Sequence, residues 1–303
     1  MPGPHGDPGD APAPARADAP AADVAVVIVN WNSGDEVTVA VRSVVEAAGD
    51  SRCEIVVVDN ASTDGSADRA QAAFPQVRVL RSAVNRGFPA AANQGMRATA
   101  APWIFLLNPD AVITAGTLGG FVEVGLDHPR AGAIGTLVRD PDGTIYPSAR
   151  KAPTYAEGLL HATLSQFAPD NRWSRAYRMA DWDRRSERRV DWVSGSSVLL
   201  RRAALDEVGL FDEAFFMYVE DLDLCTRLRA AGWEVWFSPE LEVLHVGGTV
   251  TRGKRRMTLE HSRSMYHYFV KHRSPGALAP LRPLAWAALR ARAAVVSWRR
   301  GEA

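Results

Sequence analysis

The sequence predicts an α/β fold in which helices cover both faces of a mostly parallel sheet. Two continuous runs of apolar, largely β-branched residues, at 24–30 and 54–60, are typical of strands buried on both faces. Segments with helical patterns follow these runs at about 35–48 and 64–74. This alternation of strand and helix favours a parallel sheet, because parallel strands need long crossover connections.

The same alternation continues to about residue 111. A short strand is expected at 77–80, a helix at 88–100 and a fourth strand at 103–111. Pro89 falls in the first turn of that helix, where its missing N–H costs no hydrogen bond. Asp64 is suited to cap the helix at 64–74.

The second half of the chain has a more mixed pattern. A hairpin is expected within 134–151, turning at Asp142-Gly143. Later expected elements are a strand within 192–202 with a short helix after it, a helix at 220–232 ended by Gly232, strand-like segments within 233–248 and a helix at about 258–273. Residues 154–189 are Arg-rich and show no regular pattern.

The 303 residues are expected to form three segments. Residues 1–22, rich in Pro, Ala, Gly and Asp, are expected to be disordered. Residues 23–250 are expected to form the folded domain, with halves at 23–115 and 116–250. Residues 251–303 are expected to form a basic, helical C-terminal extension.

The charge of the chain is balanced in total but unevenly distributed. Lys and Arg number 35, as do Asp and Glu, yet the part from Arg252 onwards holds 12 basic and 2 acidic residues. The acidic body would repel phosphates, so no nucleic-acid partner is expected. The extension, with Trp286 and Trp298, fits either a peripheral contact with an anionic membrane surface or a solvated helix.

The sequence also bears on where in the cell the protein is found. The sequence has neither a secretory signal pattern nor an apolar stretch of about 18 residues, so a cytoplasmic protein is expected, in contact at most with the inner face of the plasma membrane. Cys53 and Cys225 lie in apolar surroundings and are interpreted as core residues rather than as a disulfide or metal pair.

Polar residues follow three of the expected parallel strands, at 30–33, 59–64 and 108–110. Turns favour Asn, Asp and Ser in any case, so each group alone is weak evidence. Ligands of open α/β sheets, however, lie outside the carboxyl ends of the strands. The three groups together therefore predict a binding site at this edge.

Two groups of acidic residues are candidates for chemistry. Asp110 can hold Mg²⁺ or Mn²⁺ with His245 as a second ligand, although a turn Asp and a structural His are the simpler explanations. Glu220, Asp221 and Asp223 begin a helix just after an aromatic run. Helix capping explains part of this pattern, but crowded acids beside an apolar patch also suit a general base.

The strand exits also offer groups for a nucleotide. Asp59 can accept from the N3–H of uracil or thymine, while Asn30 and Asn60 hold other edges of the base. Arg86 can bind phosphate, and Gly87 can let the backbone approach a ligand closely. The alternative is a polar loop with a surface arginine.

Six segments, taken in order, closely resemble family 2 glycosyltransferases with a GT-A fold. These are VVIVNWNS, IVVVDNASTDGS, NRGFPAAANQG, WIFLLNPDA, WVSGSSVLLRRAALDEVGLFDEAFFMYVEDLDLCTRLRAAGW and VLHVGG, and they span roughly residues 23–270. The similarity is greatest to bacterial rhamnosyltransferases that act on lipid-linked cell-wall and polysaccharide precursors. Six linked motifs are more specific than any one of them.

The resemblance implies a role for each matching residue. Asp221 would be the catalytic base, with Glu220 supporting it or orienting the acceptor. Asn108 and Asp110 occupy the place of the Asp-x-Asp metal motif, with Asn replacing the first acid, and His245 would reach the metal or diphosphate. The nucleotide-sugar pocket would involve Asn30, Asp59, Asn60, Ser62, Asp64, Arg86, Gly87 and Asn93, and the acceptor side Trp192, Gly195 and Ser196.

These roles imply an inverting transfer of a sugar from a dTDP- or UDP-sugar, dTDP-rhamnose above all, to a hydroxyl of a glycan or a polyprenyl-diphosphate-linked saccharide. The reaction requires Asp110 and Asp221 to face one cleft. A sugar nucleotidyltransferase is the nearest alternative, but the loop after the first strand lacks the Gly-rich, Arg-bearing pattern for it. A dehydrogenase lacks its G-x-G-x-x-G motif here. A non-catalytic carbohydrate-binding protein would leave both acids unused.

Overall fold

The structure is a computed structural model, which describes residues 22–152, 168, 170–246, 255–273, 279–280 and 282–299. The disorder expected for residues 1–22 therefore falls on residues that lie, except for Ala22, outside the described part. The side chain of Trp298 is also outside it.

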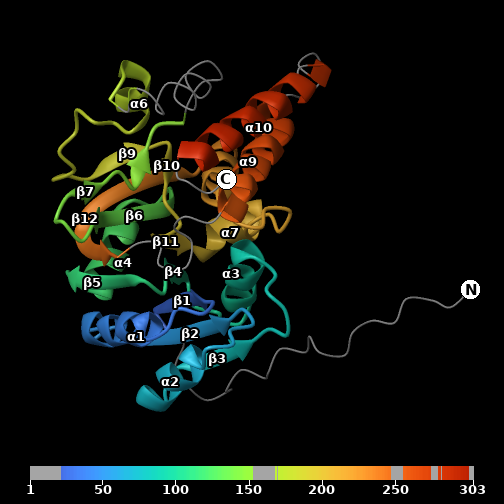
Figure 1. Ribbon diagram of the computed structural model, residues 1–303. Coiled ribbons are helices and arrows are strands. Elements are labelled where there is room, and N and C mark those ends of the chain that lie inside the picture. Colours follow the sequence, from blue (N-terminus) through green and yellow to red (C-terminus); the bar gives the residue numbers. More distant parts are fainter. Residues whose placement is uncertain are drawn as a thin grey trace, which may run out of the picture.

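One large sheet runs through the body and has ten strands within the described residues (Figure 1). Its main order is β3-β2-β1-β4-β11-β6-β12-β5, with β7 beside β6 and β9 beside β12. The bounds are β1 Val24–Asn30, β2 Cys53–Asp59, β3 Arg78–Arg81, β4 Trp103–Leu107, β5 Ala111–Ala115, β6 Ala131–Arg139, β7 Ile145–Tyr146, β9 Arg188–Val190, β11 Ser197–Arg201 and β12 Glu234–His245. A separate two-stranded sheet pairs β8 Ala149–Arg150 with β10 Trp192–Val193.

The first four strands, β3, β2, β1 and β4, are parallel neighbours, which confirms the prediction for this half. Asn30 pairs with Asp59, so the carboxyl ends of β1 and β2 lie at the same edge. After β3 the chain returns to the opposite side of β1 to form β4. Ligands of α/β sheets bind where the strand order reverses in this way.

The second half is mixed, as expected. β11 is antiparallel to both β4 and β6, whereas β12 is parallel to β6 and antiparallel to β5. The sheet is therefore continuous across the predicted division at residues 115 and 116. The predicted hairpin is present, because β6 and β7 pair antiparallel around the turn at Gly143.

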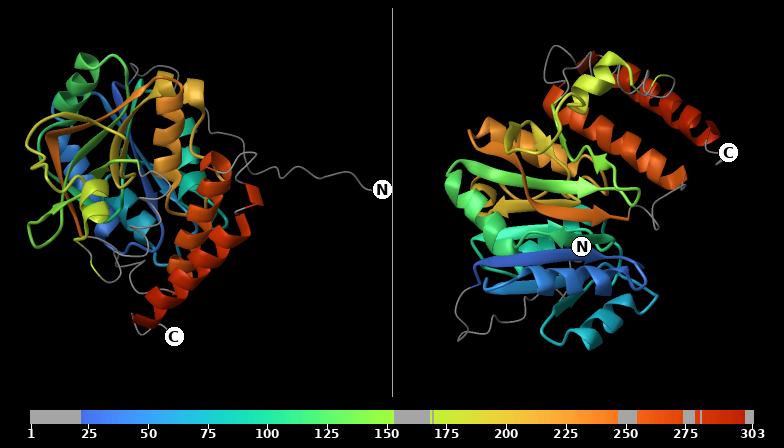
Figure 2. Two further views of the ribbon diagram at one scale, coloured as in Figure 1. Left: turned by 90° about the horizontal axis from the view of Figure 1, so that it is seen from above. Right: turned by 90° about the vertical axis from the view of Figure 1, so that its left-hand side faces the viewer.

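Helices cover both faces of the sheet (Figure 2). Side chains of α1 Glu36–Ala47, α2 Ser66–Ala73 and α4 Leu118–Asp127 belong to the apolar core on one face. Side chains of α3 Phe88–Arg97, α7 Arg202–Val208 and α8 Glu220–Ala230 belong to the core on the other. β1 contributes alternate residues to each core, such as Ile28 and Val27, as a strand buried on both faces must.

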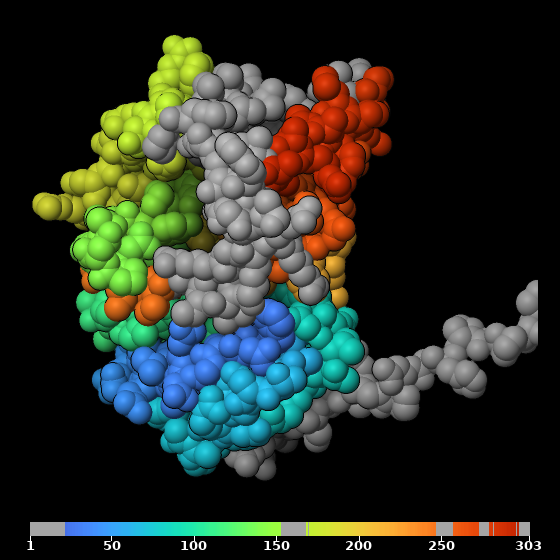
Figure 3. Space-filling model, viewed as in Figure 1, coloured from blue at the N-terminus to red at the C-terminus, as the bar shows by residue number. Residues whose placement is uncertain are grey.

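The C-terminal helices lie beside the upper half of the body (Figure 3). They are α9 Arg255–Tyr268, a π-helical turn η1 at Phe269–Arg273 and α10 Arg282–Arg299. Trp286 of α10 packs on Tyr266 of α9, with 5.1 Å between their ring centroids. Trp286, for which the sequence leaves a membrane contact or a solvated helix open, is thus partly used within this helical pair.

The structure corrects four details of the expected elements. The strand expected at 103–111 is two strands, β4 and β5, because the chain turns at Asn108-Pro109-Asp110. Helix α4 was not expected, and the segments within 233–248 form the single strand β12 with a register shift. The last helix begins before 258 and changes to π-helical geometry at Phe269. Both cysteines are free thiols, as interpreted.

Candidate active site

A cavity of about 490 Å³ opens at the carboxyl ends of the central strands. The exits of β1, β2 and β4 contribute to its wall, together with the start of α8 and two side chains of α9, His261 and Met265. The predicted site residues that line it are Asn60, Asn108, Asp110, Trp192, Gly195, Ser196, Glu220, Asp221 and His245. Asp110 and Asp221 therefore face one cavity, as the expected chemistry requires.

Two backbone hydrogen bonds bring these acids together. The amide of Asn108, at the exit of β4, donates to the carbonyl of Ser196 at 2.8 Å. The amide of Gly195 donates to Oδ2 of Asp221 at 3.0 Å. The short segment before β11 thus links the strand exit that carries Asp110 to the helix that carries Asp221.

Asp110 and His245 form a close pair at one end of the cavity. His245 ends β12, which pairs with β5, and its Nε2 lies 3.2 Å from Oδ1 of Asp110. The same nitrogen lies 3.3 Å from Nδ2 of Asn108. Both side chains of the pair are mostly buried. This arrangement offers one carboxylate oxygen and one imidazole nitrogen to a cation.

Asp221 is held at the start of α8 by an unusual turn. Tyr218 and Val219 have φ values of 69° and 72°, in the left-handed region that β-branched residues rarely adopt. Strain of this kind persists only where the surroundings enforce it, and it is common at functional sites. The turn places Glu220 and Asp221 on the cavity wall at the helix N-terminus.

The two carboxylates differ in their surroundings. Oδ2 and Oδ1 of Asp221 accept from the amides of Gly195 and Leu222. Burial raises the pKa of Asp221, although these amides and the cation of Arg150 act to lower it. Burial raises the pKa of Glu220 well above its usual range, and the charge of Asp221 raises it further. Oε2 of Glu220 has no hydrogen-bond partner among the described residues. Burial thus favours the protonated form of both carboxyls, and it does so more strongly for Glu220.

Sequence reasoning missed Arg150, which lines the same cavity. Its guanidinium carbon lies 5.4 Å from the ring centroid of Tyr146, 5.5 Å from that of Tyr177 and 4.9 Å from that of Trp192. Tyr177 belongs to helix α6 Arg172–Tyr177. The pairing of β8 with β10 places Arg150 beside Trp192, 42 positions later in the chain. No local pattern in the sequence predicts such a contact.

Several predicted nucleotide residues shape the strand exits without lining this cavity. Nδ2 of Asn30 lies 3.3 Å from Oδ1 of Asp59 and 3.1 Å from Oγ of Ser62. Asp64 accepts from the amide of Gly34 at 2.9 Å. These bonds tie the loops after β1 and β2 together, and the role of the four side chains in binding a nucleotide stays a prediction.

Arg86, Gly87 and Asn93 also lie outside the cavity wall. Gly87 was expected to allow close approach of a ligand, but a Cβ there would lie 2.3 Å from the backbone oxygen of Phe216. The close approach is therefore to the chain itself. Asn93 is 1% exposed and bonds to the backbone of Phe211 in both directions. Arg86 pairs with Glu213 at 3.5 Å.

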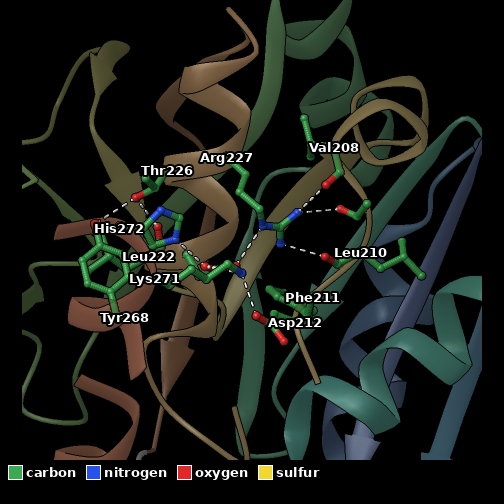
Figure 4. A network of polar contacts seen from close by, with 12 residues as sticks. Val208, Leu210, Phe211, Asp212, Leu222, Thr226, Arg227, Tyr268, Lys271 and His272 are labelled. Carbon is green, nitrogen blue, oxygen red and sulfur yellow. Dashed lines mark hydrogen bonds and ion pairs between the residues drawn. The ribbon is translucent and has the colours of Figure 1, made fainter. Parts of the chain in front are cut away.

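The acid at 223 has a different environment from its neighbours. Asp223 is fully buried, and its carboxylate contacts Nε of Arg227 at 2.9 Å, Nζ of Lys271 at 2.8 Å and Nε2 of His272 at 2.6 Å. Figure 4 shows Arg227 of α8 and the side chains of Lys271 and His272 of η1 close together, with Lys271 also contacting Asp212. Burial alone would raise the pKa of Asp223, but the three hydrogen bonds hold it well below its usual range. This network joins helix α8 to the C-terminal helices.

None of the described helices combines the length and the apolar character needed to cross a membrane. Within the same residues, no group of three or more His, Cys, Asp or Glu side chains is arranged to hold a metal ion.

Comparison with known proteins assigns the chain to a family. The model of glycosyl transferase family 2 matches residues 25–209. An N-acetylglucosaminyl-diphospho-decaprenol L-rhamnosyltransferase of Mycobacterium tuberculosis is 38% identical over 269 residues, covering 85% of this chain and 87% of that protein.

Two solved structures share the fold. The mannosyltransferase PcManGT from Pyrobaculum calidifontis, in complex with GDP-Man and Mn²⁺, aligns with a TM-score of 0.55 and 17% identity over 91% of this chain and 75% of its own. GalNAc-T7 with UDP, GalNAc and Mn²⁺ aligns with a TM-score of 0.57 and 17% identity over 89% of this chain and 55% of its own. The predicted GT-A fold is thus confirmed, and the chain belongs to glycosyltransferase family 2.

Proposed function

We propose that the protein transfers rhamnose from dTDP-rhamnose, with inversion, to a hydroxyl of N-acetylglucosamine carried on a polyprenyl diphosphate. The observation that carries the proposal is the convergence of Asp110 and Asp221 on one cavity. The similarity to the mycobacterial rhamnosyltransferase, which extends over most of both chains, supports this choice of donor and acceptor class.

Asp221 and Asp110 have different roles in the proposed reaction. Asp221 takes the proton of the acceptor hydroxyl, while its bonds to the amides of Gly195 and Leu222 fix the direction of the carboxylate. The acceptor oxygen forms a bond to the anomeric carbon as the bond from that carbon to the diphosphate breaks. Attack comes from the face opposite the diphosphate, so the configuration inverts. Glu220, with its raised pKa, donates a hydrogen bond to the acceptor.

The Asp110 end suits a divalent cation. Oδ1 of Asp110 and Nε2 of His245 lie 3.2 Å apart and would hold such an ion between them. A carboxylate is a usual ligand of Mg²⁺, and an imidazole also suits Mn²⁺. When bound, the ion would neutralise charge on the departing diphosphate. Nδ2 of Asn108 also lies 3.3 Å from Nε2 of His245, beside the proposed site.

The test of the proposal is a transfer assay that compares dTDP-rhamnose with UDP-glucose and UDP-N-acetylglucosamine, using a short polyprenyl diphosphate linked to N-acetylglucosamine. The expected products are dTDP and a disaccharide with inverted anomeric configuration. Release of pyrophosphate would indicate a sugar nucleotidyltransferase instead. Binding of donor without transfer or hydrolysis would indicate a carbohydrate-binding protein.

Replacement of Asp110 by asparagine is expected to weaken metal binding, because it removes the only carboxylate of the pair. The concentration of Mn²⁺ needed for half-maximal activity should rise by about tenfold to a hundredfold. The measurement is a titration of EDTA-treated enzyme with Mn²⁺ and with Mg²⁺. As the matched control, Asp142→Asn changes an acid in the exposed turn between β6 and β7 and should leave both curves unchanged.

Contact with a membrane would bring the enzyme to its acceptor. α9 forms part of the cavity wall, and α10 packs on α9 and carries an exposed Leu284 and several arginines. We expect the protein to sediment with vesicles that contain phosphatidylglycerol and to be released by salt, because basic residues are attracted to anionic lipids. Equal sedimentation with phosphatidylcholine vesicles would contradict a charge-driven contact.

A further inference from the structure

We propose that Arg150 binds the diphosphate group of the lipid-linked acceptor, an assignment that rests on the proposed function. Arg150 lies on the cavity wall with Asp221, and its side chain is held by three aromatic rings. The proposal separates two diphosphates in the reaction: that of the donor at Asp110 and that of the acceptor at Arg150.

The guanidinium of Arg150 has only uncharged partners within hydrogen-bond distance among the described residues. Nε donates to the carbonyl of Pro147 at 2.6 Å, Nη2 to the hydroxyl of Tyr146 at 2.7 Å and Nη1 to that of Tyr177 at 3.4 Å. These bonds use three of the five N–H groups of an arginine. One donor on each terminal nitrogen is left, which is the pair that grips a phosphate through two oxygens.

Because the guanidinium of Arg150 is buried among aromatic rings, its charge costs free energy when no anion lies against it. Burial acts to lower the pKa of Arg150, and the hydroxyls of Tyr177 and Tyr146 together with Asp221 more than reverse that effect, so the charge is retained. Aromatic faces stabilise a guanidinium but do not neutralise it. An anion that enters the cavity would find a charged, preorganised donor in a site of low polarity, where such bonds are strongest.

Other polar groups beside Arg150 are also unsatisfied. Nε1 of Trp192 has no hydrogen-bond partner among the described residues, and Trp192 is 6% exposed. Nδ1 of His261, on α9, is likewise without one in the described part. Both residues line the cavity. Buried donors and acceptors in native proteins almost always have partners, so their state points to a polar ligand here.

The chemistry of inversion decides which diphosphate Arg150 receives. The attacking oxygen and the departing diphosphate must lie on opposite faces of the anomeric carbon, and Asp221 marks the side of attack. Arg150 pairs across the strands with Trp192, three residues before Gly195, whose amide binds Asp221, whereas Asp110 is paired with His245 on β12. Arg150 therefore lies on the acceptor side.

The test uses two acceptors, one with a diphosphate and one without: N-acetylglucosamine on farnesyl diphosphate and an uncharged alkyl glycoside of the same sugar. For Arg150→Gln, KM for the charged acceptor is expected to rise by about tenfold to a hundredfold. KM for the uncharged acceptor and for the donor should be unchanged, and Arg150→Lys should recover part of the loss. Arg188→Gln is the control, because Arg188 is exposed and lies over Trp182 outside the cavity.

Three outcomes would overturn the assignment. Equal losses with both acceptors would mean that Arg150 only supports Asp221 or the fold, and a kcat pH profile shifted without a change in KM would mean the same. A rise in the donor KM alone would assign Arg150 to the donor diphosphate.

A binding measurement separates this inference from the proposed function. Farnesyl diphosphate in EDTA should bind the wild-type protein and raise its melting temperature, farnesol should not, and Arg150→Gln should abolish the shift. Binding through Arg150 in a protein that fails to transfer rhamnose would contradict the proposed function alone. No binding of farnesyl diphosphate by an enzyme that does transfer would contradict this inference alone.

Discussion

Asp221→Asn is expected to lower the rate of sugar transfer by about 10²–10⁴-fold, the usual contribution of a general base. An amide has nearly the same shape, but its NH₂ group cannot accept, so it keeps only one of the two bonds from Gly195 and Leu222, and it cannot take the proton of the acceptor hydroxyl. Donor binding should persist, because Asp110 and His245 are untouched. The measurement is kcat with saturating donor and acceptor, alongside equilibrium binding of dTDP.

Glu220→Gln is the matched control for this prediction. Burial and the charge of Asp221 raise the pKa of Glu220 and so favour its protonated form, which glutamine resembles, so this change should cost much less activity than the change at Asp221. The rate of the wild-type enzyme should increase with pH through the raised pKa of Asp221, as the base loses its proton. A transfer rate for Asp221→Asn within threefold of wild type would remove Asp221 from the mechanism.

Asp223→Asn is expected to destabilise the fold by about 3–5 kcal/mol, the usual cost of breaking a buried ion pair. The carboxylate is completely buried and faces Arg227, Lys271 and His272, and the cations of Arg227 and Lys271 would lose their common partner. The measurement is the free energy of unfolding in urea at pH 7. Asp181→Asn, in an exposed pair with Arg175, is the control and should cost about 0–1 kcal/mol.

The effect of Asp223 should depend on pH in a defined direction. Its pKa in the folded protein lies below the unfolded value of about 3.9, so the stabilisation is fully present above that value. It is lost as the pH falls below about 4 toward the folded pKa. The difference between wild type and Asp223→Asn should therefore shrink in acid. A difference that is constant from pH 7 to pH 3 would show that charge at Asp223 is not its cause.

The parallel half of the fold could be predicted because its information is local. Strands buried on both faces consist of runs of apolar residues, and polar residues that follow them, such as Asn60 and Asp110, line the cavity. The acidic cluster that begins at Glu220, beside an aromatic run, is also visible in the sequence, whereas the role of Asp221 as the base comes from the resemblance to family 2 glycosyltransferases and stays a prediction. These signals need no knowledge of distant contacts.

The remaining features depend on pairing between distant segments. β5 is too short to stand apart from β4 in the sequence, and it exists because β12 lies beside it. Arg150 becomes a candidate for the site only through its contacts with Trp192 and Tyr177, which the fold places beside it. Gly87 was correctly judged to need close approach, but the group that approaches is Phe216, which lies far along the chain.

Helix α9 forms part of the cavity wall, so the complete site extends beyond the segment that matches the family model. His261 and Met265 lie more than fifty residues past the region that identifies the family, and Asp221 is itself beyond it. A segment cut at that border would keep Asp110, Arg150 and Trp192, but it would lack Asp221, His245 and the part of the cavity wall that α9 supplies. During synthesis, therefore, the chain would complete this cavity only after α9 has been made.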